Sequence, residues 1–166
     1  MVRRLAVLAL VAGALFAVQL PADALNGAGC QAKGTASFSP ALTNPKTRIS
    51  YSMSGALNKC RSLDPITAGT ISAWGVGDLS CKKAGTTAGS FSIRWNDGRT
   101  SSGVFDAYSF GPNFVFQGKV TSGAFAGAAD TDGLAAAFAM PTIPADCAAG
   151  LSSAKFTGGI GVGNIV

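Results

Sequence analysis

The sequence predicts an all-β fold: an antiparallel sandwich or small barrel of about eight strands, with two disulfides, after a cleaved signal peptide. Three observations support this. Apolar and polar residues alternate with period two along much of the chain, turn residues rich in glycine separate the alternating runs, and the 4 cysteines form an even set. Such alternation is typical of strands with one buried face, and its regular interruption is typical of sandwiches and barrels.

The first 24 residues have the three parts of a secretory signal peptide. Arg3 and Arg4 are cationic, residues 5–18 are uncharged and apolar, and residues 22–24 (Ala-Asp-Ala) place small side chains at both positions that signal peptidase reads. The apolar run is shorter than the ~20 residues of a membrane-spanning helix. We expect residues 25–166 to be a single secreted β domain with no membrane span in the mature form.

Lipid anchoring through Cys30 is an alternative, because Ala28-Gly29-Cys30 partly matches a lipidation motif. The position three before this cysteine is Gly27, where an aliphatic residue is usual. Lipidation would also leave an odd number of cysteines. A secreted, extracellular product is therefore the main expectation.

The alternating runs predict eight strands, at residues 31–39, 47–57, 66–80, 88–96, 100–109, 113–127, 132–140 and 153–163. In the second run, Ile49, Tyr51 and Met53 share one face and serines occupy the other. In the fourth, Trp95 shares the inward face of Phe91 and Ile93, so a core position is expected for it. The later runs alternate in the same way.

Turn signals separate the runs. Asn44-Pro45 follows the first, Asn96-Asp97-Gly98 is a strong hairpin signal, and residues 111–113 and 130–133 are rich in Gly, Asn and Asp. Residues 130–133 also resemble the start of a calcium loop, but the apolar run after them lacks oxygen ligands, so a turn is expected. The alternation slips by one residue near Ser122-Gly123, which predicts a β-bulge.

The cysteines are expected to form two structural disulfides, because export delivers the chain to an oxidising compartment. Four cysteines allow three pairings. If successive strands are antiparallel, Cys30 and Cys60 lie at one pole, and Cys81 and Cys147 lie at the opposite pole. The strand count therefore favours the pairs Cys30–Cys60 and Cys81–Cys147.

Composition limits the chemistry. The chain has no histidine and no glutamate, so a Ser-His-Asp triad is excluded and the usual general base near neutral pH is missing. No metal site and no cofactor is expected. The 13 basic and 8 acidic residues are dispersed, unlike the clustered cations and interleaved aromatics of a nucleic-acid surface, so no nucleic-acid partner is expected.

Four residues are candidates for a ligand site: Trp74, Tyr51, Tyr108 and Asp106. An exposed Trp74 would offer a platform for sugar rings or a partner, although the inward face of its strand is ambiguous. Asp106 stands in a strand among aromatic residues. If its carboxyl points inward, burial would raise its pKa, and strongly shifted pKa values are common at functional sites. The alternative is an outward aspartate or one paired with Arg94 or Arg99.

Four segments carry a resemblance: residues 30–43 (CQAKGTASFSPALT), 66–72 (ITAGTIS), 93–101 (IRWNDGRTS) and 118–123 (GKVTSG). Together they resemble a group of small secreted β-rich proteins of actinobacteria. The resemblance covers nearly all of the mature chain. It implies export and a compact β fold, and it supplies no activity, ligand or site residue.

The expected function is that of a secreted non-catalytic β domain that binds a small hydrophobic ligand, a cell-wall polymer or a protein. Two alternatives remain open: a self-associating structural or surface protein, and an enzyme that relies on aspartate, lysine or tyrosine. An open barrel mouth lined by Tyr51, Trp95 or Tyr108 would favour binding. An uncharged edge strand would favour self-association, and an inward Asp106 beside a lysine or tyrosine would favour catalysis.

Overall fold

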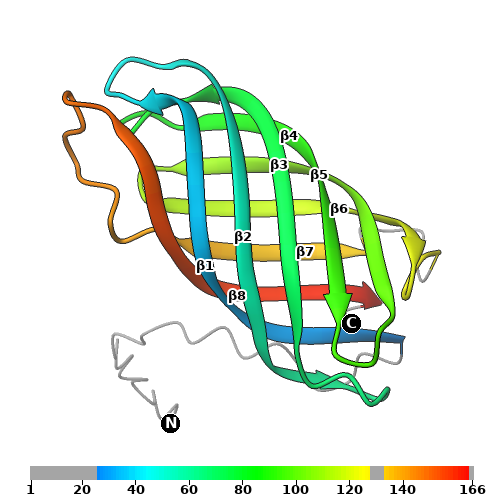
Figure 1. The fold of residues 1–166 in the computed structure, drawn as a ribbon. Helices are drawn as coiled ribbons and strands as arrows, with labels where there is room; N and C mark the ends of the chain where they lie inside the picture. Colours follow the sequence, from blue (N-terminus) through cyan, green and yellow to red (C-terminus); the bar gives the residue numbers. More distant parts are fainter. Residues whose placement is uncertain (1–25, 128–132, 165–166) are drawn as a thin grey trace, which may run out of the picture.

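The computed structural model describes residues 26–127 and 133–164, so the predicted signal peptide and most of the predicted turn at 130–133 lie outside the described residues. Eight antiparallel strands form one closed barrel (Figure 1), which confirms the all-β prediction. The strands are β1 (Asn26–Leu42), β2 (Thr47–Ser62), β3 (Gly69–Leu79), β4 (Gly85–Trp95), β5 (Thr100–Phe110), β6 (Asn113–Gly123), β7 (Leu134–Ala139) and β8 (Leu151–Asn164).

The strands follow one another around the barrel in chain order, and the barrel closes where β1 pairs with β8. This pairing is long: it runs from Asn26 opposite Asn164 to Ser37 opposite Ser153, and resumes at Leu42. Figure 1 shows β1 lying between β2 and β8. Of the two architectures that the sequence allows, the chain therefore adopts the barrel.

Alternate side chains of every strand point into the barrel and form one apolar core. On β2 the buried residues are Ile49, Tyr51, Met53 and Leu57, while the serines between them are exposed. Burial of such apolar faces supplies about 25 cal/mol per Å² of apolar surface and is the main stabilising term of the fold. Trp95 is inside, as its parity with Phe91 and Ile93 predicts.

Inward-facing glycines make room for the aromatic rings of the core. A Cβ atom on Gly75 would collide with the ring of Tyr51, and one on Gly89 would collide with the ring of Phe105. Large aromatic side chains thus lie over glycines, which have no side chain. Pairing large with small residues in this way fills the tapering interior of a small barrel.

The two disulfides lie toward opposite poles of the barrel. Cys30–Cys60 joins β1 to β2, and Cys81–Cys147 joins the loop after β3 to the loop before β8. Both pairings agree with the sequence prediction. We call the two ends the Cys30 pole and the Cys81 pole.

Three register shifts interrupt the ladders, one of them between β1 and β8 from Ser37 to Leu42. Between β5 and β6 the register shifts as Ser102 pairs with Ser122 and Gly103 pairs with Val120, so Thr121 is an extra residue, next to the predicted bulge at Ser122-Gly123. A second shift between β1 and β2 lies at Cys30, where Lys59 has a positive φ of 51°. The sequence prediction did not include this second bulge.

Candidate functional site: an aromatic patch on the outer face

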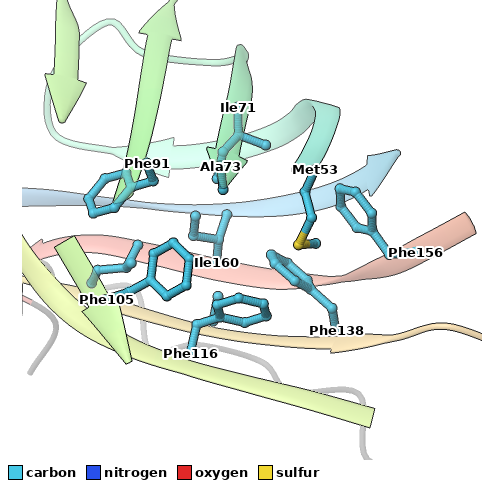
Figure 2. A pocket seen from close by; sticks show the side chains of 11 residues that line it. Met53, Ile71, Ala73, Phe91, Phe105, Phe116, Phe138, Phe156 and Ile160 are labelled. Atoms are coloured by element: carbon cyan, nitrogen blue, oxygen red, sulfur yellow. The ribbon is translucent and has the colours of Figure 1, made fainter. Parts of the chain in front are cut away.

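The barrel interior is the first place to look for a ligand, and it is filled. Figure 2 shows side chains from several strands directed into one central space, among them Met53, Phe105 and Phe116. The aromatic rings pack closely, with 5.2 Å between the centroids of Phe105 and Phe116 and 5.0 Å between those of Phe138 and Phe156. The remaining cavity measures about 20 Å³. That is the space of a single water, so this central cavity is too small for a ligand.

The Cys30 pole is closed by Trp95 and its neighbours. The indole N–H of Trp95 donates to the Ser101 hydroxyl at 2.9 Å, and that hydroxyl donates to the Ala124 carbonyl at 2.6 Å. Phe125 packs edge-on against the indole, with 5.8 Å between ring centroids. Asn96 accepts hydrogen bonds from the backbone N–H groups of residues 67 and 68, which fixes the loop after β2.

The Cys81 pole is closed by the loop of residues 140–150. The Asn44 side chain donates to Asp146 at 2.8 Å and accepts from the Cys147 backbone N–H at 3.0 Å. These bonds tie the loop to the turn after β1. Hydrogen bonds from Asn44 and from the Ala148 backbone, and then the charge of Lys82, hold the pKa of Asp146 below its usual value. Among the described residues, these contacts close both poles, so neither presents the open mouth that an internal binding site needs.

The outer surface has one group of exposed apolar side chains on β3, β5 and β6. Trp74 is 54% exposed, Tyr108 is 45% exposed and Phe110 is 58% exposed. We call the group the β3–β6 patch, and its members are Trp74, Val76, Val104, Tyr108, Phe110 and Val115.

Strand register places these residues on one continuous face. Trp74 pairs with Ser90 on β4, and Ser90 pairs with Val104 on β5. One strand row is thus Trp74, Ser90, Val104 and the exposed Lys119 on β6, and a later row brings Tyr108 opposite Val115 on β6. The small side chains of β4, such as Ser90 and Ala88, leave the larger ones on either side accessible.

The neighbouring row of the outer surface is different in character. It consists of small hydroxyl side chains in register from β1 to β6: Thr35, Ser54, Ser72, Ser92, Ser102 and Ser122. Ser102 and Ser122 are joined by a hydrogen bond of 2.7 Å. The apolar character of the patch is therefore a local feature of the outer surface.

Asp106 lies in the middle of the β3–β6 patch. It is exposed on β5 between Val104 and Tyr108, and its cross-strand partners are Ala88 and Gln117. Within the described part of the chain, no lysine or arginine nitrogen lies within 4.0 Å of its carboxylate. Arg99, suggested as its partner by the sequence, pairs instead with Asp64 and Asp97.

The structure brings three of the four candidate residues together and separates the fourth. Trp74, Tyr108 and Asp106 share the patch, whereas Tyr51 is buried and its hydroxyl lies 2.8 Å from the Thr87 hydroxyl. Burial raises the pKa of Tyr51 to about 12, against the opposing effect of the Thr87 hydrogen bond.

The sequence interpretation missed Val76, Val104, Phe110 and Val115. The available signal was parity: on β5 the even-numbered residues from Val104 to Phe110 share one face, and the odd-numbered residues share the other. Both faces of that segment contain aromatic residues, so alternation alone did not show that one of them is exposed.

A shallow hollow on β1 and β2 is lined by serines, among them Ser37, Ser39 and Ser50. The aromatic residues beneath it, Phe38 and Tyr51, are buried, so this hollow offers hydroxyl groups without an exposed ring. It is a weaker candidate than the patch.

Within residues 26–127 and 133–164, no three or more Cys, Asp or Glu side chains are grouped so that they could hold a metal ion. The same residues include no helix of the length and apolarity that a membrane crossing requires. No protein-family model, curated protein or solved structure matches the chain significantly.

Proposed function

We propose that the mature chain is a secreted, non-catalytic domain that binds a cell-wall polymer through the β3–β6 patch. The observation that carries this proposal is the position of the exposed aromatic residues. Trp74, Tyr108 and Phe110 lie on one outer face of a barrel whose interior is filled. Contiguous exposed apolar groups of this kind mark interaction sites.

Export is supported by the predicted signal peptide, by the resemblance to secreted actinobacterial proteins and by the two disulfides. Cys81 and Cys147 are buried, and the described residues contain no free cysteine. Disulfides of this structural kind form and persist in oxidising compartments. After export, a wall polymer is among the first macromolecules that the domain meets.

The packed core argues against an internal small hydrophobic ligand, because a cavity of about 20 Å³ admits only a water-sized group. Self-association through the edges of β1 and β8 is disfavoured because these two strands pair with each other and close the barrel. Catalysis is disfavoured because the chain has no histidine and no glutamate to serve as a general base. Asp106, the candidate carboxylate, is exposed on the outer face of the barrel.

Co-sedimentation with insoluble, purified peptidoglycan sacculi tests the proposal. We expect the mature protein to pellet with the sacculi, and we expect Trp74→Ala and Tyr108→Ala each to weaken the apparent affinity about tenfold, which is about 1.4 kcal/mol and above the loss that most interface residues show. Leu63→Ala is the matched control, because Leu63 is also an exposed apolar residue but lies outside the patch.

High salt separates patch binding from attraction by net charge. The mature chain has 11 basic and 7 acidic residues, so anionic wall polymers attract it non-specifically. At 1 M salt the screening length is ~3 Å and such attraction is removed. Binding that disappears in salt, or that does not depend on Trp74, contradicts the proposal.

A further inference from the structure

Building on the proposed function, we infer that the β3–β6 patch recognises a run of N-acetylated pyranose rings within the polymer. Two features of the patch lead to this: the separation of its aromatic side chains, and the carboxylate that lies between them.

The aromatic residues are too far apart for a single sugar. Trp74 and Tyr108 are two strands apart across the sheet and four residues apart along it, because Trp74 is in register with Val104 through Ser90. With strand spacings of about 4.8 Å and a rise of about 3.3 Å per residue, their Cα atoms lie about 16 Å apart. A ligand that contacts both must be an oligomer, with one ring near Trp74 and another near Tyr108 or Phe110.

The apolar faces of pyranose rings suit these side chains. Aromatic rings carry negative charge on their faces, so they attract the polarised C–H groups of a sugar ring as well as burying its apolar surface. The small residues of β4, Ala88 and Ser90, leave a low strip between the larger side chains of β3 and β5 along which a chain can lie.

Asp106 selects for a hydrogen-bond donor that is adjacent to an apolar group. Its carboxylate accepts hydrogen bonds and donates none. Beside it on β5 is Val104, and across the ladder on β6 is Gln117, whose amide both donates and accepts. An acetamido substituent matches this set: its N–H donates to Asp106, its carbonyl accepts from Gln117, and its methyl group contacts Val104.

Other occupants satisfy the patch less well. A second copy docked about a two-fold axis through the centre of the patch would bring two Asp106 carboxylates together. An acyl chain or lipid surface would desolvate an unpaired carboxylate, which is costly. A basic peptide would pair with Asp106, but the net positive charge of the mature chain repels it.

Isothermal titration with β-1,4-linked N-acetylglucosamine oligomers of one to six units tests the inference. We expect undetectable binding of the monomer, affinity that increases with length until the oligomer spans the patch, and at least tenfold weaker binding of the matching glucose oligomers. Trp74→Ala and Tyr108→Ala should each weaken hexamer binding about tenfold, whereas Leu63→Ala should not change it. These residues are exposed, so their replacement leaves the core intact.

Asp106→Asn tests the proposed selectivity separately. The amide can still accept a hydrogen bond but lacks the charge, and charge-assisted bonds are roughly twice as strong as neutral ones. We therefore expect the preference for N-acetylglucosamine over glucose oligomers to shrink several-fold, with a much smaller change in binding of the glucose oligomers themselves.

The outcomes distinguish this inference from the proposed function. If no N-acetylglucosamine oligomer binds but the sacculi still bind in a Trp74-dependent way, the inference is overturned and the proposed function stands. If neither binds, both are overturned. A concentration-dependent dimer that Trp74→Ala dissociates, without oligosaccharide binding, identifies a second copy as the occupant and also overturns the inference.

Discussion

Trp95 and Trp74 show how the same side chain serves the two faces of the barrel. Trp95 is 2% exposed and its indole N–H is bonded to Ser101, whereas Trp74 is half exposed on the outer face. The first completes the core at the Cys30 pole. The second has no partner within the core and is available to a ligand.

Phenylalanine substitutions at the two tryptophans should therefore differ in their effect on stability. Trp95→Phe removes the bond to Ser101 and leaves a void, so we expect the free energy of unfolding to fall by about 2 kcal/mol. Trp74→Phe should change it by less than about 0.5 kcal/mol. Urea unfolding of both variants measures the difference, and equal destabilisation would contradict these assignments.

Tyr51 predicts an alkaline dependence of stability. Its pKa is raised to about 12 by burial, so between about pH 10 and pH 12 the unfolded chain loses the phenolic proton while the folded chain keeps it. The stability contributed by the neutral phenol is present below pH 10 and is lost as the pH rises through this window. The free energy of unfolding should fall by about 1 kcal/mol per pH unit there.

Replacing Tyr51 by phenylalanine isolates this effect. At pH 7 the variant loses the bond to Thr87, and we expect a cost of about 1 kcal/mol. Between pH 10 and pH 12 its stability should fall less steeply than that of the wild type, because the variant lacks the buried phenol. Tyr108→Phe is the control: Tyr108 is on the outer surface, so the wild-type pH dependence should remain.

At the scale of elements, inward glycines explain why the β3–β6 patch was hard to find from sequence. On β3 the inward positions include Gly75 and Gly77, while Trp74 and Val76 point outward. Hydropathy alone therefore favours the wrong face of this segment. The burial of Tyr51 over Gly75 resolves the ambiguity, and that contact depends on register between strands.

The 140–150 loop is the element that depends most on its crosslink. The Cys81–Cys147 bridge spans 66 residues of sequence and the Cys30–Cys60 bridge spans 30. Each bridge is expected to stabilise the fold by about 2–4 kcal/mol. In the chain-entropy model the Cys81–Cys147 bridge contributes about 0.7 kcal/mol more, because it closes the longer loop. Replacing both cysteines of a pair by serine, followed by thermal unfolding, should therefore destabilise the Cys81–Cys147 variant more.

Hydrogen exchange locates the effect of each replacement. In the variant without the Cys81–Cys147 bridge, the backbone N–H of residue 147, which donates to Asn44 in the wild type, should lose protection before the amides of β1 and β8. The Cys30–Cys60 variant serves as the control and should keep protection in this loop. Uniform loss of protection throughout the barrel would contradict a local role for the loop crosslink.

For the whole molecule, the sequence was sufficient to predict the strands and the disulfides but not the closure. Strand parity follows from local alternation, and it placed Cys81 and Cys147 at one pole. Closure depends on the pairing of β1 with β8, which are the most distant strands in the chain, and no local pattern specifies it. For the same reason the sequence did not show that the interior is filled and that the candidate site lies outside.

One continuous core predicts one cooperative unfolding transition. In the Trp74→Phe variant the remaining indole, Trp95, reports on the core alone, so its fluorescence should change at the same urea concentration as the far-ultraviolet circular dichroism. Separate midpoints would show that the two poles unfold independently. The wild type, with both tryptophans present, provides the reference for signal amplitude.

The pairing of β1 with β8 also determines how the barrel responds to mechanical force. Asn26 and Asn164 are register partners, so both ends of the described barrel leave from the Cys30 pole. Tension applied through these two residues acts across the ladder and breaks its hydrogen bonds one after another, as in a zipper, instead of shearing them all together. The Cys30–Cys60 bond lies a few residues into β1 and would pass the force to β2. A domain held on a wall polymer by its outer face and pulled by its ends would open first along this seam.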